Sequence, residues 1–343
     1  MRKIFGNLPN GGSASLYRIS LGALTADLTD YGATLVRLFV PDRGGRTADV
    51  VLGFDNCQDY ARSTAFFGAT VGRNANRIGG ASFPLNGGEV RLTPNENGNN
   101  LHSGPDFYHT RLWQVEDRSD SAITFRLDSP SGDQGYPGNA VIRVTYRLEN
   151  PDTLCILYSG LCDTDTVFNL TNHSYFNLAG HDRPELAMGQ TLCMPAWVFC
   201  PDDPENIPTG ELRPVEGTPM DFRLPKPLGR DIGQDYLPLR LQGGYDHNFE
   251  VFCAPCAILS DPVSGRAMAV STDCPGLQVY SANFVREAGK DGVVYPPRCA
   301  VALETQFYPD SLHHPQWKQP ITPAGQPYRS WTRYRFFQED GQE

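Results

Sequence analysis

The chain has 343 residues, of which 40% are hydrophobic and 20% are charged, and its formal net charge is −10; the composition is ordinary for a globular protein with a sizeable core. The negative charge and the lack of a dense Lys/Arg block argue against a nucleic-acid-binding or anionic-membrane surface. No apolar run in the sequence reaches the length of a membrane span.

Neither a signal peptide nor a disulfide framework is indicated. Residues 1–7 include basic residues but no apolar stretch of signal-peptide length. The nine cysteines are an odd number scattered among apolar neighbours, which is typical of free thiols in a reducing compartment, so we predict a cytoplasmic protein. Cys253 and Cys256 have C-x-x-C spacing, but a zinc site needs further ligands, and we interpret them as plain thiols.

Alternating apolar and polar residues predict a series of strands that each bury one face. In residues 142–148, for example, Ile142, Val144, Tyr146 and Leu148 alternate with polar residues. Between the segments lie turn sequences rich in Gly, Pro, Asn and Asp. In chain order, the segments that we predict as strands are residues 17–21, 33–40, 50–52, 123–127, 142–148, 154–158 and 328–336.

Helical signals are few. Asp55 and Asn56 can cap a short helix that runs through Ala61, but no long stretch repeats with a helical period. There is no internal repeat of constant period and no linker-like change of composition. An all-β chain with turn signals every ten residues or so is typical of a sandwich or barrel. We therefore predict one large antiparallel domain that spans residues 1–343.

Two polar clusters precede the middle of the chain. Residues 72–78 contain two Asn and two Arg side chains, whose hydrogen-bonding groups suit sugar hydroxyls, although a solvated turn has the same composition. Residues 95–104 form a second polar loop, which ends with His102. A lone loop histidine is more often a surface residue than a ligand-binding one.

Three further clusters hold the residues best suited to proton transfer. His173 lies among Asn, Ser and Tyr in residues 169–178, and histidine exchanges a proton near neutral pH. Asp246 stands beside a histidine in residues 244–249. Glu304 directly follows an apolar run, and at a strand end facing a cleft its pKa would be raised, as suits a base. Each of these residues taken alone fits an ordinary core, turn or edge position as well.

Taken together, the clusters resemble the aldose 1-epimerases, also called galactose mutarotases. The resemblance runs from about residue 16 to residue 336, and T-N-H-S-Y-F-N-L followed downstream by L-E-T-Q is highly specific. The matching motifs are G-R-x-A-N-R-I at residues 72–78, N-x-L-H-x-G at 99–104, G-Y-P-G at 135–138, T-N-H-S-Y-F-N-L at 171–178, P-T-G-E at 208–211, G-T-P-x-D-F-R at 217–223, G-Y-D-H-x-F at 244–249 and L-E-T-Q at 303–306.

The resemblance implies a fold, an activity and a set of site residues. The fold is a β-supersandwich of two large antiparallel sheets. Glu304 would match the general base that takes the proton of the anomeric hydroxyl, and His173 the general acid that protonates the ring oxygen. The chemistry needs one acid and one base and neither cofactor nor metal. The substrate is a small aldohexose, held by residues that match Asn76, Arg77, His102, Ser174, Tyr175, Asp246 and Gln278.

Departures from the family pattern lie near the expected cleft, at Ser103, at residues 281–283 and at residues 311–314, where loops set sugar preference. Three alternatives stay open. A hexose 6-phosphate epimerase would need extra basic residues for the phosphate. A carbohydrate-binding protein would share the fold without the chemistry. A glycoside hydrolase would use Glu304 and Asp246 as its two carboxyl groups. The sequence leaves the preferred aldose and the oligomeric state open.

Overall fold

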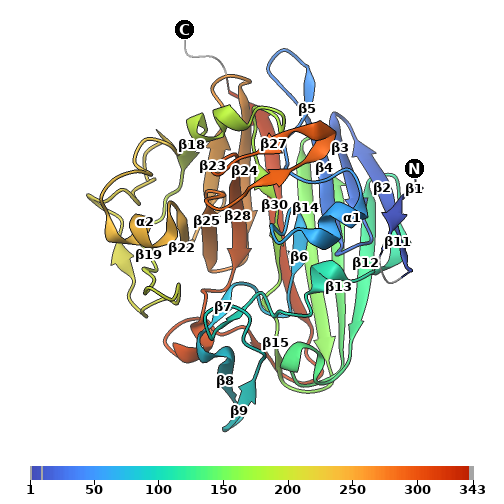
Figure 1. Ribbon diagram of the computed structural model, residues 1–343, viewed down its shortest axis with the longest axis vertical. Helices are drawn as coiled ribbons and strands as arrows, with labels where there is room; N and C mark the ends of the chain where they lie inside the picture. The colour runs from blue at the N-terminus through green and yellow to red at the C-terminus, as the bar shows by residue number, and fades with distance from the viewer. Residues whose placement is uncertain (1, 9–10, 340–343) are drawn as a thin grey trace.

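Antiparallel β-strands dominate the computed structural model, which describes residues 2–8 and 11–339 (Figure 1). The described strands form two layers, with the principal hydrophobic core between them. The predicted all-β architecture of two large antiparallel layers is confirmed. The predicted alternation is also confirmed: in residues 142–148, Ile142, Val144, Tyr146 and Leu148 are all buried, whereas the residues between them are partly or fully exposed.

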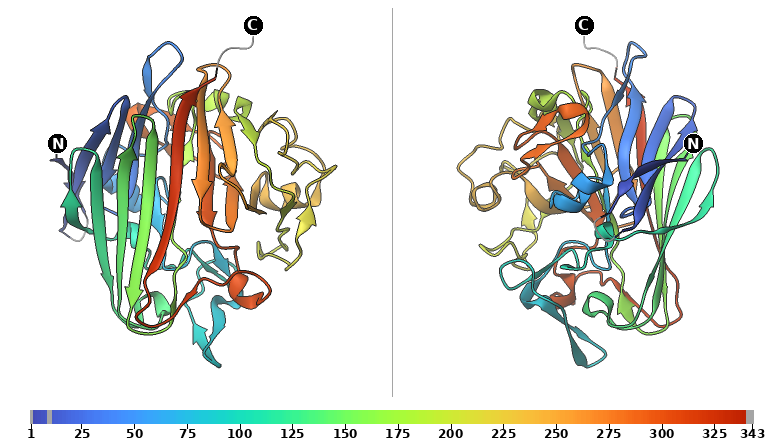
Figure 2. Two further views of the ribbon diagram at one scale, coloured as in Figure 1. Left: turned by 180° about the vertical axis from the view of Figure 1, so that it is seen from behind. Right: turned by 45° about the vertical axis from the view of Figure 1, so that its right-hand side comes forward.

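The first layer is one large sheet, which Figure 2 shows from behind. The C-terminal strand lies in the middle of this sheet, so residues far apart in the sequence are hydrogen-bonded neighbours. In spatial order, the nine strands found among the described residues are β11 (Gln114–Arg118), β12 (Ala122–Ser129), β13 (Ala140–Glu149), β14 (Thr153–Cys162), β30 (Tyr328–Gln338), β24 (Arg266–Thr272), β23 (Ala257–Ser260), β18 (Thr191–Cys193) and β21 (Lys226–Pro227).

The second layer combines two sheets. One contains β1 (Arg2–Asn7), β2 (Ser13–Leu21), β3 (Leu24–Thr29), β4 (Thr34–Pro41) and β5 (Thr47–Asp49). The other contains β17 (Tyr175–Phe176), β28 (Val301–Gln306), β25 (Gly276–Tyr280), β22 (Asp246–Glu250), β19 (Val198–Phe199) and β20 (Arg213–Pro214). A single bridge between Val51 and Phe176 joins the two sheets.

Contacts between the layers hold the core together. Phe176 of the second layer packs on Tyr334 of β30, with ring centroids 5.0 Å apart. The Tyr334 hydroxyl donates a hydrogen bond to the Leu303 carbonyl of β28 at 3.4 Å. Full burial of a side chain such as Leu or Phe stabilises a fold by about 1.5–3 kcal/mol. The strands that carry the candidate site therefore rest on a well-packed base.

Short elements connect and cover the sheets. The two-stranded pairs are β6 (Ala69–Val71) with β16 (Thr171–His173), β7 (Arg77–Ile78) with β10 (Asn100–Leu101), β8 (Ser82–Leu85) with β9 (Gly88–Arg91), β15 (Thr166–Val167) with β29 (Ile321–Thr322) and β26 (Glu287–Ala288) with β27 (Val294–Tyr295). The helices are α1 (Cys57–Arg62) and α2 (Leu237–Gln242), with 3-10 turns η1 (Gly79–Ala81), η2 (Tyr108–Thr110), η3 (Asp133–Gly135), η4 (Pro184–Gly189), η5 (Lys290–Gly292) and η6 (Ser311–His313).

Three short elements compare differently with the sequence-based expectations. The predicted strand at residues 50–52 is wrong: the returning strand is β5, and of the three residues only Val51 forms a β-bridge, to Phe176. The predicted short helix is confirmed as α1, capped by Asn56, whose side chain accepts from the Asp59 amide at 3.0 Å. The sequence did not predict α2, since its six residues are too few to show a helical period.

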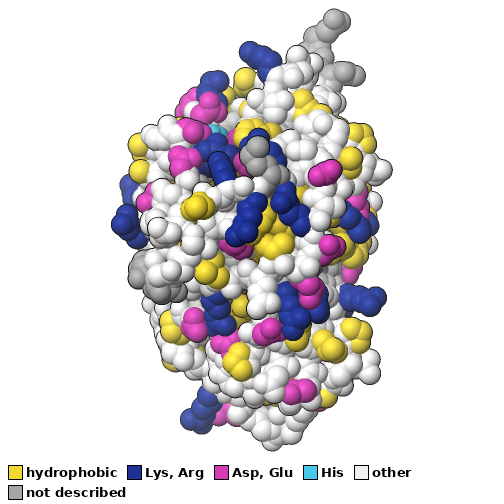
Figure 3. All heavy atoms as spheres, turned by 90° about the vertical axis from the view of Figure 1, so that its right-hand side faces the viewer, with side chains coloured by type: hydrophobic (Ala, Val, Ile, Leu, Met, Phe, Trp, Pro, Cys, Tyr) yellow, Lys and Arg dark blue, Asp and Glu magenta, His cyan; other side chains and the backbone are white. Residues whose placement is uncertain are grey.

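Two features expected from the sequence concern the surface charge and the helices: the lack of a basic patch for nucleic acid or anionic membranes, and the lack of a membrane span. Figure 3 shows one face of the molecule, on which Lys and Arg side chains are interspersed with Asp and Glu rather than gathered in one area. Of the helices in the part of the chain that the structure describes, none combines the length and the apolar character needed to cross a membrane.

A buried ion pair joins the start of η5 to the second layer. The Lys290 ammonium is fully buried and donates to Asp49 Oδ2 at 2.6 Å and to the Val36 and Val51 carbonyls at 2.8 and 2.7 Å. The other carboxylate oxygen of Asp49 accepts from the Leu38 amide at 3.0 Å. Each charged group is thus fully hydrogen-bonded, which a buried pair requires.

Removing one member of this pair should strongly destabilise the protein. We expect Lys290→Met to lower the free energy of unfolding by about 3–5 kcal/mol, because the buried Asp49 charge would lose its closest partner and keep only the Arg37 guanidinium, 3.6 Å away. Urea denaturation followed by circular dichroism measures this. Lys3→Met, at an exposed position, is the control and should change the free energy by less than about 0.5 kcal/mol. A loss below about 1 kcal/mol for Lys290→Met would contradict this account of the pair.

Candidate active site

The two faces of the six-stranded sheet differ because successive side chains of a strand point in opposite directions. On β28, Val301 and Leu303 belong to the core between the layers, so Glu304 points to the other face. That face borders a cavity of about 400 Å³, which Glu304 helps to line. The volume lies within the range of small-molecule sites.

Strand register places the polar side chains of this face beside one another. Asn248, Gln278 and Glu304 lie opposite each other on β22, β25 and β28. In the next row, Asp246 lies opposite Tyr280, and β17 places Tyr175 opposite Ala302. The alternation also separates Asp246 from its neighbour His247, which packs against Phe199 in the core. Residues from four strands thereby reach one cavity.

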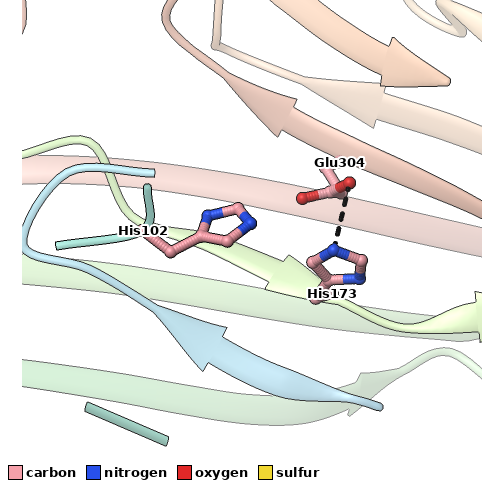
Figure 4. A group of neighbouring side chains, drawn as sticks. All are labelled: His102, His173 and Glu304. Atoms are coloured by element: carbon pink, nitrogen blue, oxygen red, sulfur yellow. Dashed lines mark ion pairs between the residues drawn. The ribbon is translucent and has the colours of Figure 1, made fainter. Parts of the chain in front are cut away.

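Glu304 and His173 face each other across this cavity (Figure 4). His173 is the last residue of β16 and lies opposite Ala69 of β6. Its Nε2 is 3.6 Å from Glu304 Oε1, which is longer than a normal hydrogen bond. Glu304 Oε2 is buried and has no hydrogen-bond partner. Both groups are therefore available to a molecule in the cavity.

Burial shifts the two pKa values in opposite directions. Burial raises the pKa of Glu304 well above its usual range, as does the nearby Asp246 carboxyl, whereas the Arg77 guanidinium lowers it. Burial lowers the pKa of His173 to about 4. Both shifts favour the uncharged form of the pair, in which Glu304 carries the proton and His173 is a neutral imidazole.

Hydrogen bonding fixes the proton on the His102 ring. His102 Nδ1 accepts from the Asn76 amide at 3.0 Å, so the neutral imidazole carries its proton on Nε2. Figure 4 shows this ring pointing toward His173 and Glu304. Asn76 and His102 both adopt left-handed backbone conformations, with φ of 62° and 53°. Asn and His tolerate this region better than most residues do, and such conformations cluster at functional sites.

His102, His173 and Glu304 are close enough together to be considered as metal ligands, since one ligand atom of each lies within 4.8 Å of the others. A metal needs a free lone pair on each imidazole. The only lone pair of neutral His102 accepts the Asn76 amide proton. The donor set in this form fits a sugar hydroxyl better than a metal ion.

Arg77 reaches the cavity while it is held by Glu96. Arg77 Nε and Nη2 donate to the two carboxylate oxygens of Glu96 at 2.5 and 3.0 Å, a bidentate arrangement that fixes the guanidinium. Both side chains line the cavity. The sequence analysis did not select Glu96, and the only sequence feature that pointed to it was its place in the polar loop of residues 95–104.

Most of the predicted site residues meet in the cavity, which is lined by Asn76, Arg77, His102, His173, Tyr175, Asp246 and Glu304. Two do not line it. The Ser174 hydroxyl is buried and donates to Asn172 Oδ1 at 2.5 Å. Gln278 Nε2 donates to Asp246 Oδ1 at 2.7 Å, so this side chain orients Asp246 without lining the cavity itself.

Two other expectations about the site require correction. Glu304 does not stand at a strand end; it is the fourth of the six residues of β28. The apolar residues 301–303 and the polar residues 304–306 form one strand, in which only the alternate side chains Val301 and Leu303 belong to the core. Arg73, grouped with Arg77 as a source of sugar-binding forks, is fully buried and donates to Ser129 and Pro137. Phe66 and Tyr280 line the cavity and were not selected from the sequence.

The chain matches the family model described as aldose 1-epimerase over residues 15–335. It is 38% identical to the galactose mutarotase of Mus musculus over 342 residues, which cover 98% of each chain. It is 37% identical to the aldose 1-epimerase of Haemophilus influenzae, covering 96% of this chain and 98% of that one. Among solved structures, it is similar to the GalM/aldose epimerase homologue from C. elegans, with a TM-score of 0.88, 30% identity and coverage of 95% and 100% of the two chains.

The state of the His102 ring is directly measurable. We expect ¹⁵N NMR of histidine-labelled protein to show neutral His102 with its proton on Nε2 at pH 6, where an unperturbed imidazole is mostly protonated. Burial lowers its pKa well below the usual value, and His173 and Arg77 lower it further. His313 is the internal control: its bond to Asp310 raises its pKa, so it should be largely protonated at pH 6. A charged His102 ring at pH 6 would contradict the assignment.

Proposed function

The chain belongs to the aldose 1-epimerase family of isomerases, and from this premise we propose that it interconverts the α and β anomers of a free aldohexose of the glucose or galactose type. We propose further that Glu304 and His173 transfer the protons. The residues proposed to hold the sugar are Asn76, Arg77, His102, Tyr175 and Asp246.

The opposed pair of Glu304 and His173 is the observation that carries this proposal. Mutarotation needs one group that accepts a proton from the anomeric hydroxyl and one that gives a proton to the ring oxygen. The two side chains line the same cavity, are nearly fully buried, and stand 3.6 Å apart without a direct hydrogen bond. A hemiacetal placed against both would bring its two oxygens within reach of an acid and a base.

The proton count follows from the chemistry. In the charge-separated form of the pair, the Glu304 carboxylate takes the proton from the anomeric hydroxyl as the His173 imidazolium protonates the ring oxygen. The bond between the anomeric carbon and the ring oxygen breaks, and the aldehyde forms. Rotation about the first carbon–carbon bond presents the other carbonyl face, and closure returns both protons. The pair holds one proton before ring opening and one after it.

The pKa shifts favour the neutral form of the pair, which is the form that accompanies the open-chain aldehyde. The charge-separated form that begins ring opening therefore has to be stabilised within the site. Arg77 lowers the pKa of Glu304 and supplies part of this stabilisation. Because the two groups share a proton, the limbs of the pH profile belong to the pair rather than to either residue.

The charges around the cavity favour an uncharged sugar. The basic residues that line it are Arg77, already bound to Glu96, and Arg286; the acidic ones are Glu96, Asp246, Glu287 and Glu304. A phosphate would meet more acidic than basic groups, and sugar phosphates are usually bound by Arg or Lys clusters. A hydrolase would use Asp246 as its second carboxyl group, but its bond to Gln278 and the nearby Arg77 suit it to hold a hydroxyl.

We propose the cytoplasm as the location of the protein. All nine cysteines are free thiols, and seven of them are buried. Thiols persist in this state in a reducing compartment.

Polarimetry tests the proposed activity and both proton carriers. With freshly dissolved α-glucose or α-galactose, the protein should accelerate the change in optical rotation above the spontaneous rate, also after chelator treatment. Glu304→Gln removes the proton acceptor and His173→Asn the titrating group while keeping similar shape. We expect each to lower kcat by about 10²–10⁴-fold.

The exposed Glu89 provides a matched control, and Glu89→Gln should retain the wild-type rate. A folded Glu304→Gln variant that kept near wild-type activity would refute the assigned mechanism. No acceleration by the wild-type protein on any aldose would refute the proposed function itself.

A phosphorylated sugar separates the free-sugar enzyme from its alternative. We expect kcat/KM for α-glucose 6-phosphate to be at least about tenfold lower than for glucose, since one unfavourable charged contact of about 1.4 kcal/mol has this effect. Arg286→Ala should leave activity on glucose within about twofold of the wild type, because no bond to a neutral sugar is assigned to this side chain. Faster turnover of the phosphate ester would favour the alternative function.

A further inference from the structure

Phe66 occupies a strained position in the loop between α1 and β6. Its φ of 58° places it in the left-handed region, which is unfavourable for a bulky side chain. Its carbonyl accepts from the Ala69 amide at 3.0 Å, which closes a tight turn. The ring of Phe66 lines the cavity. Such conformations persist where the surrounding structure enforces them, and they cluster at active sites.

The strained backbone brings the Phe66 ring onto His173. The two ring centroids are 5.7 Å apart and the planes are inclined by 20°. A second aromatic ring, Tyr175, stacks against His173 at 4.8 Å and 27°. Phe107 and His109 pack against Phe66 with centroid distances of 5.2 and 4.5 Å.

Aromatic faces attract cations, and the attraction strengthens where water is excluded. Burial alone disfavours the imidazolium form of His173. Two stacked rings act in the opposite direction, because the negative charge density of their faces meets the positive charge of the imidazolium. The proposed reaction needs this charged form at the start of ring opening.

We propose that Phe66 is a positioning residue of this enzyme, which holds the His173 imidazole in place and stabilises its protonated form during catalysis. The inference rests on the proposed function. Phe66 exchanges no proton itself; it acts through His173, and it belongs to none of the motifs that supply the proposed proton carriers.

Other charged and titratable groups also surround His173 and have to be held constant in any test. They come from several elements: Glu304 on β28, Asp246 on β22, Arg77 on β7, His102 after β10, His109 in η2, Tyr175 on β17 and Tyr280 on β25. Phe66→Leu changes none of these side chains, but the ring that it removes also packs against His102 and His109, with centroid distances of 4.9 and 4.5 Å. The titration therefore follows all three histidines.

NMR titration of His173 in the wild type and in Phe66→Leu tests the proposal without relying on activity. We expect the midpoint of His173 protonation to fall by about 0.5–1 pH unit in the variant, since the imidazolium loses one of its two aromatic neighbours. Under the proposed mechanism, kcat at pH 7 should fall by about the same factor, roughly 3- to 10-fold, with a smaller change in KM. Phe66→Tyr keeps the ring face and should restore both values.

Phe107→Leu is the matched control, because Phe107 belongs to the same aromatic cluster but is not stacked on His173. It should leave the His173 midpoint within about 0.2 pH unit. An unchanged midpoint in a folded Phe66→Leu variant, or an equal shift in Phe107→Leu, would overturn the proposal. A wild-type protein that accelerates no anomer exchange would instead refute the proposed function, whatever the titration shows.

Discussion

The account depends on one constraint: a carboxyl group and an imidazole must be buried face to face without bonding to each other. Glu304 and His173 satisfy it at a separation of 3.6 Å. A direct hydrogen bond would tie up the groups that a substrate needs, and open exposure to water would remove the pKa shifts that let the pair retain one proton.

The β architecture provides the necessary rigidity. Glu304 and Gln278 lie opposite each other on neighbouring strands whose other faces belong to the core, so neither can shift without disturbing packing between the layers. His173 comes from the separate β16–β6 pair, which brings its imidazole to the Glu304 carboxyl from outside the sheet. The Lys290–Asp49 ion pair attaches η5 to the second layer, and η5 follows the cavity-lining residues 284–287 in the sequence. Sites on such elements are positioned more accurately than sites on free loops.

Sequence reasoning succeeded where a rule is local. Period-two alternation identified β13 and its neighbours, and the T-N-H-S-Y-F-N-L and L-E-T-Q motifs selected His173 and Glu304. It failed where the tertiary structure determines the direction of a side chain. Ser174 lies next to His173 in sequence, yet alternation turns it away from the cavity to Asn172. Phe66 enters the site only because a left-handed turn directs it there, and no local pattern reports that.

The most direct test of the shared proton is the double variant Glu304→Gln/His173→Asn, measured by polarimetry beside the two single variants. If both groups act in one coupled proton transfer, removing the second should cost little once the first is gone, and the double variant should be about as slow as the slower single variant. If the two losses multiplied, the side chains would contribute independently, and the one-proton pair on which the account rests would be contradicted.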